Sequence, residues 1–370
     1  MSNSSKLLLL FSLFLFVIVS KTGYAQKNLL SGFVIDGTII GVKDSTIVKL
    51  FDIDASKILD SSYTINGKFK LRGSVDKPTS CWLQCLNEYS IIQVENSPMT
   101  FYSPLKNMKL ESIVTGGKEQ SLQTKLDHIQ RPYERIYTLA YDSLNNKNYR
   151  DSLHRIKLFK IIKKASEAYM NIYVAYGKKH INSHLGLDIV YRNRNKVPKD
   201  SILILYNSLP LEMRKNNVAL ALKLYAVNHT LKKGDVFLDF EVNTIAGIPF
   251  KLSSLRGKYI YLTFGSFTCG PCRIENREIR KNYNILSKTV HLVNFSLDVN
   301  RKEWEAASKI DDILWYNVSD MEGMVGKIKT LYDVQAMPTS FLIDKNGIII
   351  KRFEGYSPAH FSEIMELASK

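Results

Sequence analysis

The stretch YLTFGSFTCGPCRIENREI, from Tyr261 to Ile279, decides the fold of the last third of this chain. It begins with an apolar run rich in β-branched and aromatic residues, which is typical of a strand covered on both faces of a sheet. It ends in a charged, helix-favouring run. Cys269 and Cys272 stand at the transition, with Gly270 and Pro271 between them. The stretch therefore predicts a buried strand that leads into a helix, with a cysteine pair at the helix start.

The sequence around this stretch, over residues 231–370, extends the same pattern. VHLVNFSLD is a second apolar run, and RKEWEAASK after it has the composition of a helix. TSFLIDKNGIIIKRF holds two strand-like runs around Asn346-Gly347, a pair that favours a tight hairpin because both residues accept positive φ. The order of strands and helices predicts an α/β domain with a central sheet.

The position of the cysteine pair indicates redox chemistry. The first N–H groups of a helix are unpaired and carry partial positive charge, which stabilises a thiolate and lowers its pKa. Pro271 fits the first helical turn, and Arg273 adds positive charge nearby. We expect Cys269, at the exposed end, to attack a substrate disulfide. We expect Cys272, one turn inward, to resolve the mixed disulfide.

Other uses of the pair are less consistent with the sequence. A structural zinc site needs four ligands, and the chain has no second Cys-x-x-Cys. A c-type haem needs His directly after the second cysteine, where Arg273 stands. We therefore expect no metal and no cofactor. An inert structural disulfide stays open as the alternative.

Residues 231–370 resemble the secreted bacterial thiol–disulfide oxidoreductases of the TlpA and ResA type, thioredoxin-fold proteins of the AhpC/TSA-like superfamily. The matching segments are GDVFLDFEVNTIAGIPFKLSSLRGKYIYLTF, CGPCRIE, VNFSLD and MPTSFLIDKNGIIIKRFEG. The resemblance covers the whole last third of the chain. It implies a thioredoxin-like fold and a redox-active disulfide between Cys269 and Cys272.

The resemblance also implies a substrate-binding surface around the disulfide. Pro338 of MPTSF would be the cis-proline that faces the disulfide. The backbone of Met337 would pair with an extended substrate segment, as in strand addition. Thr339, Gly270 and Pro271 would complete this surface.

Glu275, three residues after Cys272, matches an acidic residue that lies near the buried cysteine in ResA-like relatives. The resemblance implies that it transfers protons to and from the thiols. The alternative is a solvated residue of the first helical turn, favoured there by the helix dipole.

The sequence departs from common thioredoxins at several positions. Gly265 and Thr268 stand where many relatives have tryptophan, Thr263 replaces a buried Asp, and Arg277 replaces a helix-kinking proline. The loss of both tryptophans removes flat apolar surface and leaves the choice of substrate open.

The dipeptide Gly270-Pro271 is that of reducing thioredoxins, near −270 mV, which favours a protein disulfide reductase. Its expected partners are disulfide-containing client proteins and a membrane-embedded thiol reductant. One alternative is a peroxidase of the peroxiredoxin type, which Ser266 fits loosely while Leu262 stands where proline is needed. A second alternative is a redox-inert binding module.

The N-terminus has the layout of a secretory signal peptide over residues 1–25. Lys6 precedes an apolar core from Leu7 to Val19, and the small residues Gly23 and Ala25 precede a cut before Gln26. The core is shorter than the roughly 20 residues of a spanning helix, although an uncleaved anchor stays open. We expect a periplasmic protein.

Two further regions precede the α/β domain. Residues 26–117 predict a small all-β domain, with Asn66-Gly67 marking a hairpin. Its segments INGKFKLRGSV and VENSPMTFYS resemble a β-domain often fused ahead of such thioredoxin-like domains. Residues 118–230 carry apolar residues at helical spacing and predict a helical connecting region.

The remaining polar residues indicate little further chemistry. Cys81 and Cys85 lie in a strand-like run, where they would stand about 13 Å apart, so we expect two buried free thiols. If the segment were helical the two could meet, and this alternative stays open. His180 and His184 are spaced to share a helix face, a weak hint of a metal site. The net charge is +16, but the lysines are scattered and no nucleic-acid motif accompanies them, so we expect no nucleic-acid partner.

Overall fold

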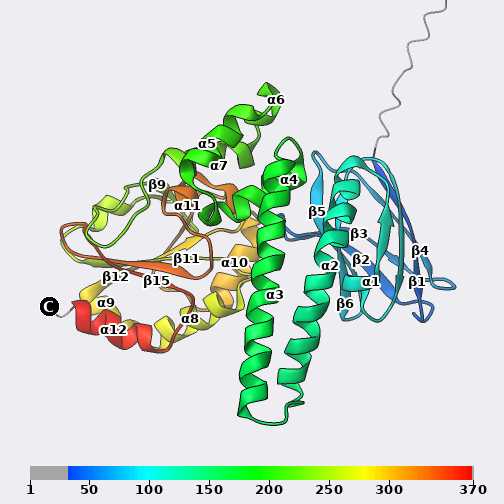
Figure 1. Cartoon of the computed structure of the whole chain (residues 1–370). Coiled ribbons are helices and arrows are strands. Elements are labelled where there is room, and N and C mark those ends of the chain that lie inside the picture. The colour runs from blue at the N-terminus through cyan, green and yellow to red at the C-terminus, as the bar shows by residue number, and fades with distance from the viewer. Residues whose placement is uncertain (1–31, 369–370) are drawn as a thin grey trace, which may run out of the picture.

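The computed structural model describes residues 32–368 and divides into three regions along the chain (Figure 1). A β-sandwich comes first, a set of helices follows, and an α/β domain ends the chain. The expected signal peptide lies outside the described residues. Between residues 32 and 368, no helix is long and apolar enough to cross a membrane.

The sandwich consists of two four-stranded sheets. One has the order β4 (Lys68–Gly73), β1 (Phe33–Ile40), β7 (Pro98–Pro104), β8 (Ile113–Thr115), and α1 (Met108–Glu111) connects its last two strands. The other has the order β3 (Lys57–Tyr63), β2 (Ile47–Asp52), β5 (Thr79–Cys85), β6 (Glu88–Val94). Apolar and polar residues alternate along the strands, so each sheet turns one apolar face inward to a shared core.

The hairpin expected at Asn66-Gly67 is wrong, although the tight turn itself forms. Both residues have positive φ, and Ile65 and Lys68 exchange backbone hydrogen bonds of 2.9 and 3.0 Å across the turn. However, β3 and β4 on either side of it belong to different sheets. The turn is therefore a corner where the chain changes sheets, because burial of each strand's apolar face overrides local pairing.

The helical region packs between the sandwich and the α/β domain (Figure 1). Two long helices, α2 (Lys118–Asn145) and α3 (Ser152–Lys179), form an antiparallel hairpin. Shorter elements follow: α4 (His184–Arg192), η1 (Arg194–Lys196), α5 (Lys199–Ser208), α6 (Leu211–Arg214) and α7 (Asn217–Val227). The expectation that His180 and His184 share a helix face is wrong, because the chain turns between α3 and α4.

The α/β domain has one seven-stranded sheet, in the order β10 (Pro249–Lys251), β9 (Glu241–Thr244), β13 (Tyr316–Ser319), β12 (Val290–Ser296), β11 (Tyr259–Gly265), β14 (Thr339–Ile343), β15 (Ile349–Glu354). Its helical elements are η2 (Leu252–Leu255), α8 (Gly270–Lys281), α9 (Tyr283–Thr289), α10 (Arg301–Ile310), η3 (Gly323–Val325), α11 (Lys327–Leu331) and α12 (Ala359–Ala368). The second predicted hairpin is confirmed, since β14 and β15 pair antiparallel around Asn346-Gly347.

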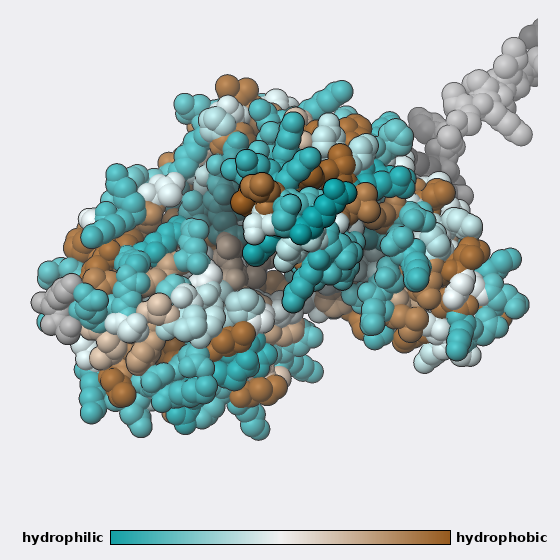
Figure 2. All heavy atoms as spheres, turned by 60° about the horizontal axis from the view of Figure 1, so that its bottom comes forward, coloured by the Kyte–Doolittle hydropathy of each residue, from teal (hydrophilic) through white to brown (hydrophobic). Residues whose placement is uncertain are grey.

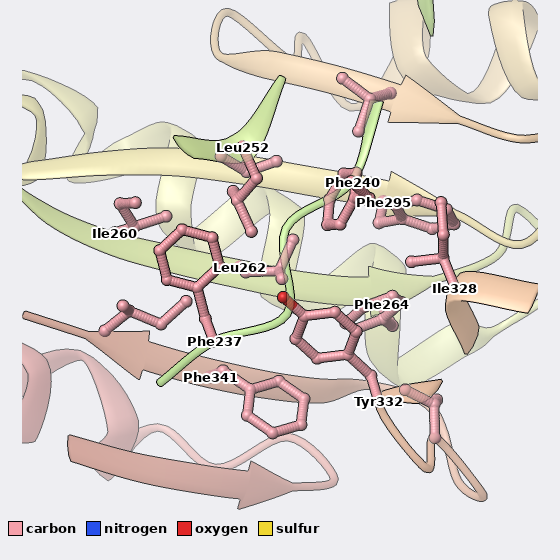
Figure 3. Packing of buried hydrophobic residues seen from close by; sticks show 14 of the residues in the cluster. Phe237, Phe240, Leu252, Ile260, Leu262, Phe264, Phe295, Ile328, Tyr332 and Phe341 are labelled. Carbon is pink, nitrogen blue, oxygen red and sulfur yellow. The ribbon is translucent and has the colours of Figure 1, made fainter. Parts of the chain in front are cut away.

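Two hydrophobic layers cover this sheet, because successive side chains of a strand point to opposite faces. Leu262 and Phe264 of β11 pack with Phe341 and Tyr332 on one face (Figure 3). Tyr261 packs on the other face with residues of α8, α9 and α12. All seven residues of β11 are buried, as its apolar sequence predicts. On the face shown in Figure 2, polar side chains dominate and hydrophobic ones are scattered.

Candidate redox site

The cysteine pair lies at the junction of β11 and α8, as the sequence predicts. Cys269 is the N-cap of α8, and its Sγ accepts a hydrogen bond of 3.2 Å from the backbone N–H of Cys272. The two sulfurs are bonded at 2.06 Å, with Cα atoms 5.2 Å apart. Cys269 is half-buried and Cys272 is buried, so the two sulfurs differ in access to solvent.

Gly265 borders the inner cysteine from the end of β11. A Cβ atom at this position would lie 3.2 Å from Cβ and 3.3 Å from Sγ of Cys272. Such distances are tighter than ordinary van der Waals contact, so a larger residue would crowd the inner sulfur. This gives a local physical reason for glycine where many relatives have tryptophan.

A buried carboxylate that the sequence analysis missed holds the loop before Cys269. Asp298 follows β12, and its Oδ1 accepts hydrogen bonds from Ser266 Oγ at 2.7 Å and from the Phe267 N–H at 3.0 Å. Its Oδ2 accepts another from Ser296 Oγ at 2.6 Å. Burial raises the pKa of Asp298, and these hydrogen bonds oppose the rise. The available signal was its position, since the carboxyl ends of adjacent parallel strands meet at one sheet edge.

Glu275 lies one turn after Cys272 and is only 4% exposed, so the solvated alternative is wrong. The Tyr261 hydroxyl donates a hydrogen bond of 2.6 Å to Glu275 Oε1, and Ser340 Oγ lies 3.5 Å from the same oxygen. Burial raises the pKa of Glu275 to about 7, against the opposing effect of these two hydroxyls. The sequence analysis did not find Tyr261 or Ser340, which come from the neighbouring strands β11 and β14.

A small cavity borders Glu275 between α8, β11 and the segment that leads into α12. It has a volume of about 140 Å³, and its lining includes Glu275, Tyr261 and His360. Oε2 of Glu275 has no hydrogen-bond partner within residues 32–368. A carboxyl group in this position can exchange a proton near neutral pH without a charged partner.

Arg273 lies near the cysteine loop, as expected, with one guanidinium nitrogen 3.5 Å from the Phe267 carbonyl oxygen, but its charge is partly compensated. Its guanidinium pairs with Asp311, whose side chain is 1% exposed. Arg277 lies 3.6 Å from the same carboxylate. The unpaired N–H groups at the start of α8 add further partial positive charge at the pair.

The predicted substrate-binding residues come from two segments: Met337, Pro338 and Thr339 lead into β14, and Gly270 and Pro271 begin α8. The Met337–Pro338 peptide is cis. Thr339 begins β14 and pairs with Phe264 near the end of β11. Met337 and Thr268 both line a cavity of about 190 Å³ whose opposite wall is the sandwich turn Ile53–Ser56. Gly270 and Pro271 are exposed beside the disulfide.

The other cysteines and the histidines form no comparable site. Cys81 and Cys85 are buried free thiols on β5, as expected from their strand spacing. In the part of the chain that the structure describes, no group of three His, Cys, Asp or Glu side chains could hold a metal ion.

Two family models match parts of the chain. Residues 233–352 match the AhpC/TSA family, and residues 33–123 match a domain of unknown function, DUF4369. The first covers the candidate site and most of the α/β domain. The second covers the sandwich and the start of α2, and its description assigns no activity.

Several known proteins are similar to the α/β domain. Thiol-disulfide oxidoreductase ResA of Geobacillus thermodenitrificans is 29% identical over 142 residues, 37% of this chain and 80% of that protein. The thioredoxin-like protein YneN of Bacillus subtilis is 28% identical over 123 residues, 32% of this chain and 69% of that protein. Probable nucleoredoxin 3 of rice is 28% identical over 110 residues, which is 28% of this chain but only 23% of the rice protein.

Among solved structures, a putative thiol:disulfide interchange protein DsbE from Chlorobium tepidum is 29% identical, with a TM-score of 0.35. The match covers 38% of this chain and all of that one. The AhpC/TSA match includes the Cys269–Cys272 disulfide, and the ResA relatives are named thiol-disulfide oxidoreductases. The C-terminal domain therefore belongs to the AhpC/TSA family of thioredoxin-like proteins, and its homologues are thiol–disulfide oxidoreductases.

Proposed function

We propose that this protein reduces disulfides in client proteins outside the cytoplasm. The observation that carries the proposal is the asymmetry of the disulfide. Cys269 is accessible at the first turn of α8, whereas Cys272 is buried one turn inward with Glu275 behind it. The accessible sulfur can meet a substrate, and the buried one is protected from it.

The reaction needs two steps from the reduced form. The Cys269 thiolate attacks one substrate sulfur, forms a mixed disulfide and releases the other substrate sulfur as a thiolate. The Cys272 thiolate then attacks Cys269 Sγ, which restores the protein disulfide and releases the second substrate thiolate. Two electrons pass from the protein to the substrate, and both substrate thiolates take up protons.

Glu275 is the proposed proton carrier for the buried sulfur. Residues three apart on a helix lie on the same side, so Glu275 follows Cys272 along the inner face of α8. Its pKa of about 7 allows it to accept a proton from the Cys272 thiol and to return one after reduction. The cavity beside Glu275 provides room for exchange of that proton with solvent.

The proposed substrate groove lies between the cysteine loop and β14. An extended substrate segment would pair with the backbone of Met337 and contact Pro338 and Thr339. Gly270 and Pro271 would form the other side of the groove. The sandwich turn Ile53–Ser56, across the adjoining cavity, limits the groove on its far side.

Return to the reduced form requires a dithiol donor. The proposed location outside the cytoplasm follows from the signal-peptide layout of residues 1–25. Electrons would then have to reach the protein from a membrane-embedded thiol reductant. The direction of electron flow rests on the Gly-Pro dipeptide, which is typical of reducing thioredoxins.

The test is to trap clients with Cys272→Ser in the native host. This variant keeps the attacking sulfur and lacks the resolving one, so clients should remain attached to Cys269 as mixed disulfides. The matched control is Cys269→Ser/Cys272→Ser, which should trap nothing. Equal recovery from both variants would contradict the proposal.

A measurement of the reduction potential of the wild-type protein distinguishes the proposed reductase from a redox-inert binding module. A structural disulfide should lie below about −300 mV, whereas a reductase should lie near −270 mV. Peroxide consumption by the reduced protein tests the peroxidase alternative, since the proposed reductase should consume peroxide slowly compared with insulin disulfides.

A further inference from the structure

Residues of all three regions line a cavity. The three regions meet beside α4 (Figure 1). The volume of the cavity is about 400 Å³. The sandwich contributes Asp54 and Lys77, the helical region contributes Arg192 and Arg194, and the α/β domain contributes Lys329. We call this space the junction cavity. The proposed disulfide chemistry does not use it.

Lys329 of α11 is the unexplained side chain of this cavity. It is 1% exposed, yet within residues 32–368 its ammonium has no hydrogen-bond or ion-pair partner. Its contact is with the ring of Tyr191, 5.6 Å from the centroid. Burial of an unpaired ammonium is unfavourable by several kcal/mol, so side chains in this state are rare unless they bind something.

The charges that act on Lys329 are mostly of its own sign. Burial, followed by Arg194 and Arg192, lowers the pKa of Lys329 to about 7, while Asp333 acts in the opposite direction. Arg194 is itself 2% exposed and lies 3.5 Å from Asp333. Asp333 therefore already compensates Arg194. The end of the cavity that holds Lys329 has an excess of positive charge.

The acids of the cavity wall already have partners. Arg192 donates to Asp54 at 2.5 Å and to Asp188 at 2.6 Å. Asp52 accepts hydrogen bonds of 2.9 Å from the backbone N–H groups of Asp54 and Ala55. Glu322 is exposed and accepts from a backbone N–H. These carboxylates therefore already have hydrogen-bond or ion-pair partners, whereas the N–H donors of Lys329 have none among the described residues.

We propose that the junction cavity binds a small organic anion whose carboxylate or phosphate group accepts hydrogen bonds from Lys329. The volume suits a metabolite-sized molecule rather than a single ion. A bound oxyanion would stabilise the protonated form of Lys329, which burial and the nearby arginines otherwise disfavour. Because the walls come from all three regions, the ligand would also hold these regions together. The site does not depend on the proposed reductase activity.

The first test uses pyridoxal 5′-phosphate as the probe, because it combines a phosphate with an aldehyde. An aldehyde forms an imine with a neutral amine and releases water, and borohydride then reduces the imine to a stable secondary amine. On the full chain at pH 7.5, Lys329 should be labelled about 10-fold faster than exposed lysines, which are mostly protonated with a pKa near 10.4. Peptide mass spectrometry gives the rate at each lysine.

Protection by unlabelled anions identifies the ligand chemistry. Inorganic phosphate or citrate should slow labelling of Lys329 at least about 5-fold, as expected for occupancy above four-fifths. Sodium chloride at equal ionic strength should not. Protection by phosphate alone supports a phosphorylated ligand, and protection by citrate alone supports a carboxylic acid. Labelling no faster than at exposed lysines, without protection by either anion, would overturn the proposal.

Direct titration of the full chain with phosphate and with citrate by calorimetry provides the second test. Binding should be lost in Lys329→Met, which removes the ammonium and keeps a similar side-chain volume. It should persist in Lys327→Met, a matched control two residues away on the exposed side of α11. Equal binding to both variants would contradict a site at Lys329. The protection experiment needs only the wild-type protein, so it decides the matter even if Lys329→Met does not fold.

Discussion

The chain carries two cysteine pairs, and they differ in what their backbone permits. Cys81 and Cys85 are four residues apart on β5, which separates them by about 13 Å along an extended strand. Cys269 and Cys272 are three residues apart at the start of α8, with Cα atoms 5.2 Å apart. The first pair cannot form a disulfide within the strand, whereas helical geometry brings the second pair into bonding range.

The surroundings of the two pairs differ as much as their geometry. Burial raises the pKa of Cys81, and the nearby Asp52 and Asp54 add to the rise. Burial also raises the pKa of Cys85. Cys269, in contrast, is half-buried at the N-terminus of a helix, which favours a thiolate. The same residue type is therefore buried in the core of the sandwich and partly accessible at a helix start in the α/β domain, where we propose redox chemistry.

The largest expected effect comes from removal of the accessible sulfur. Cys269→Ser should lower the rate of insulin-disulfide reduction by on the order of 1,000-fold, because the three remaining cysteines are buried and cannot readily form the mixed disulfide. The matched variant Cys81→Ser should change this rate less than about 2-fold, because Cys81 does not contact the site. Comparable losses in both variants would break the distinction between the pairs.

Alkylation of the reduced protein tests the difference in reactivity directly. With iodoacetamide at pH 7.5, Cys269 should react at least about 100-fold faster than Cys81 or Cys85, since the buried thiols react only after local opening. In 6 M guanidinium the three rates should converge. A native rate at Cys81 within a few-fold of that at Cys269 would show that the sandwich pair is accessible.

Glu275 should make the stability of the α/β domain depend on pH. Its pKa rises from 4.5 in the unfolded chain to about 7 in the folded one, so the folded state binds the proton more tightly. The stability of the domain should therefore fall as pH rises from about 4.5 to 7, by about 3 kcal/mol in total. Glu275→Gln cannot ionise and should lack this decrease.

The measurement is urea unfolding of the oxidised protein at pH 4.5, 6 and 8. A Trp82→Phe background leaves Trp304 and Trp315, both in the α/β domain, as the fluorescent probes. If the free energy of unfolding depends on pH in the same way with Glu275 and with Glu275→Gln, then Glu275 does not titrate in this range. The sandwich pair should contribute no slope below pH 8, because burial raises the pKa values of both thiols.

The sequence could predict those features of the α/β domain that depend on short segments of the chain. The strand, the helix start and the cysteines between them lie within residues 261–279, and the hairpin at Asn346-Gly347 joins neighbouring strands. These features depend on local periodicity and turn chemistry. The α/β order follows from them, whereas the thioredoxin-like fold is implied by the family resemblance of residues 231–370.

The features that the sequence could not predict depend on contacts between distant segments. Asn66-Gly67 has the residues of a hairpin turn, but packing of the two sheets decides where the strands on either side go. Arg273 is followed by no acid at helical spacing that would predict its pairing with Asp311, 38 residues later. Tyr261 reaches Glu275 only because β11 turns alternate residues to the α8 face.

The smallest expected effect is on the stability of the sandwich. Cys81 is fully buried, so Cys81→Ala should leave a small cavity and destabilise the sandwich by about 1 kcal/mol. Hydrogen exchange of β5 peptides should report this loss, while insulin reduction stays unchanged. Faster exchange in the α/β domain as well would show that the sandwich stabilises the α/β domain. A loss of reductase activity without faster exchange would instead indicate that Cys81 takes part in the reaction. The sandwich cysteines could then no longer be described as core residues alone.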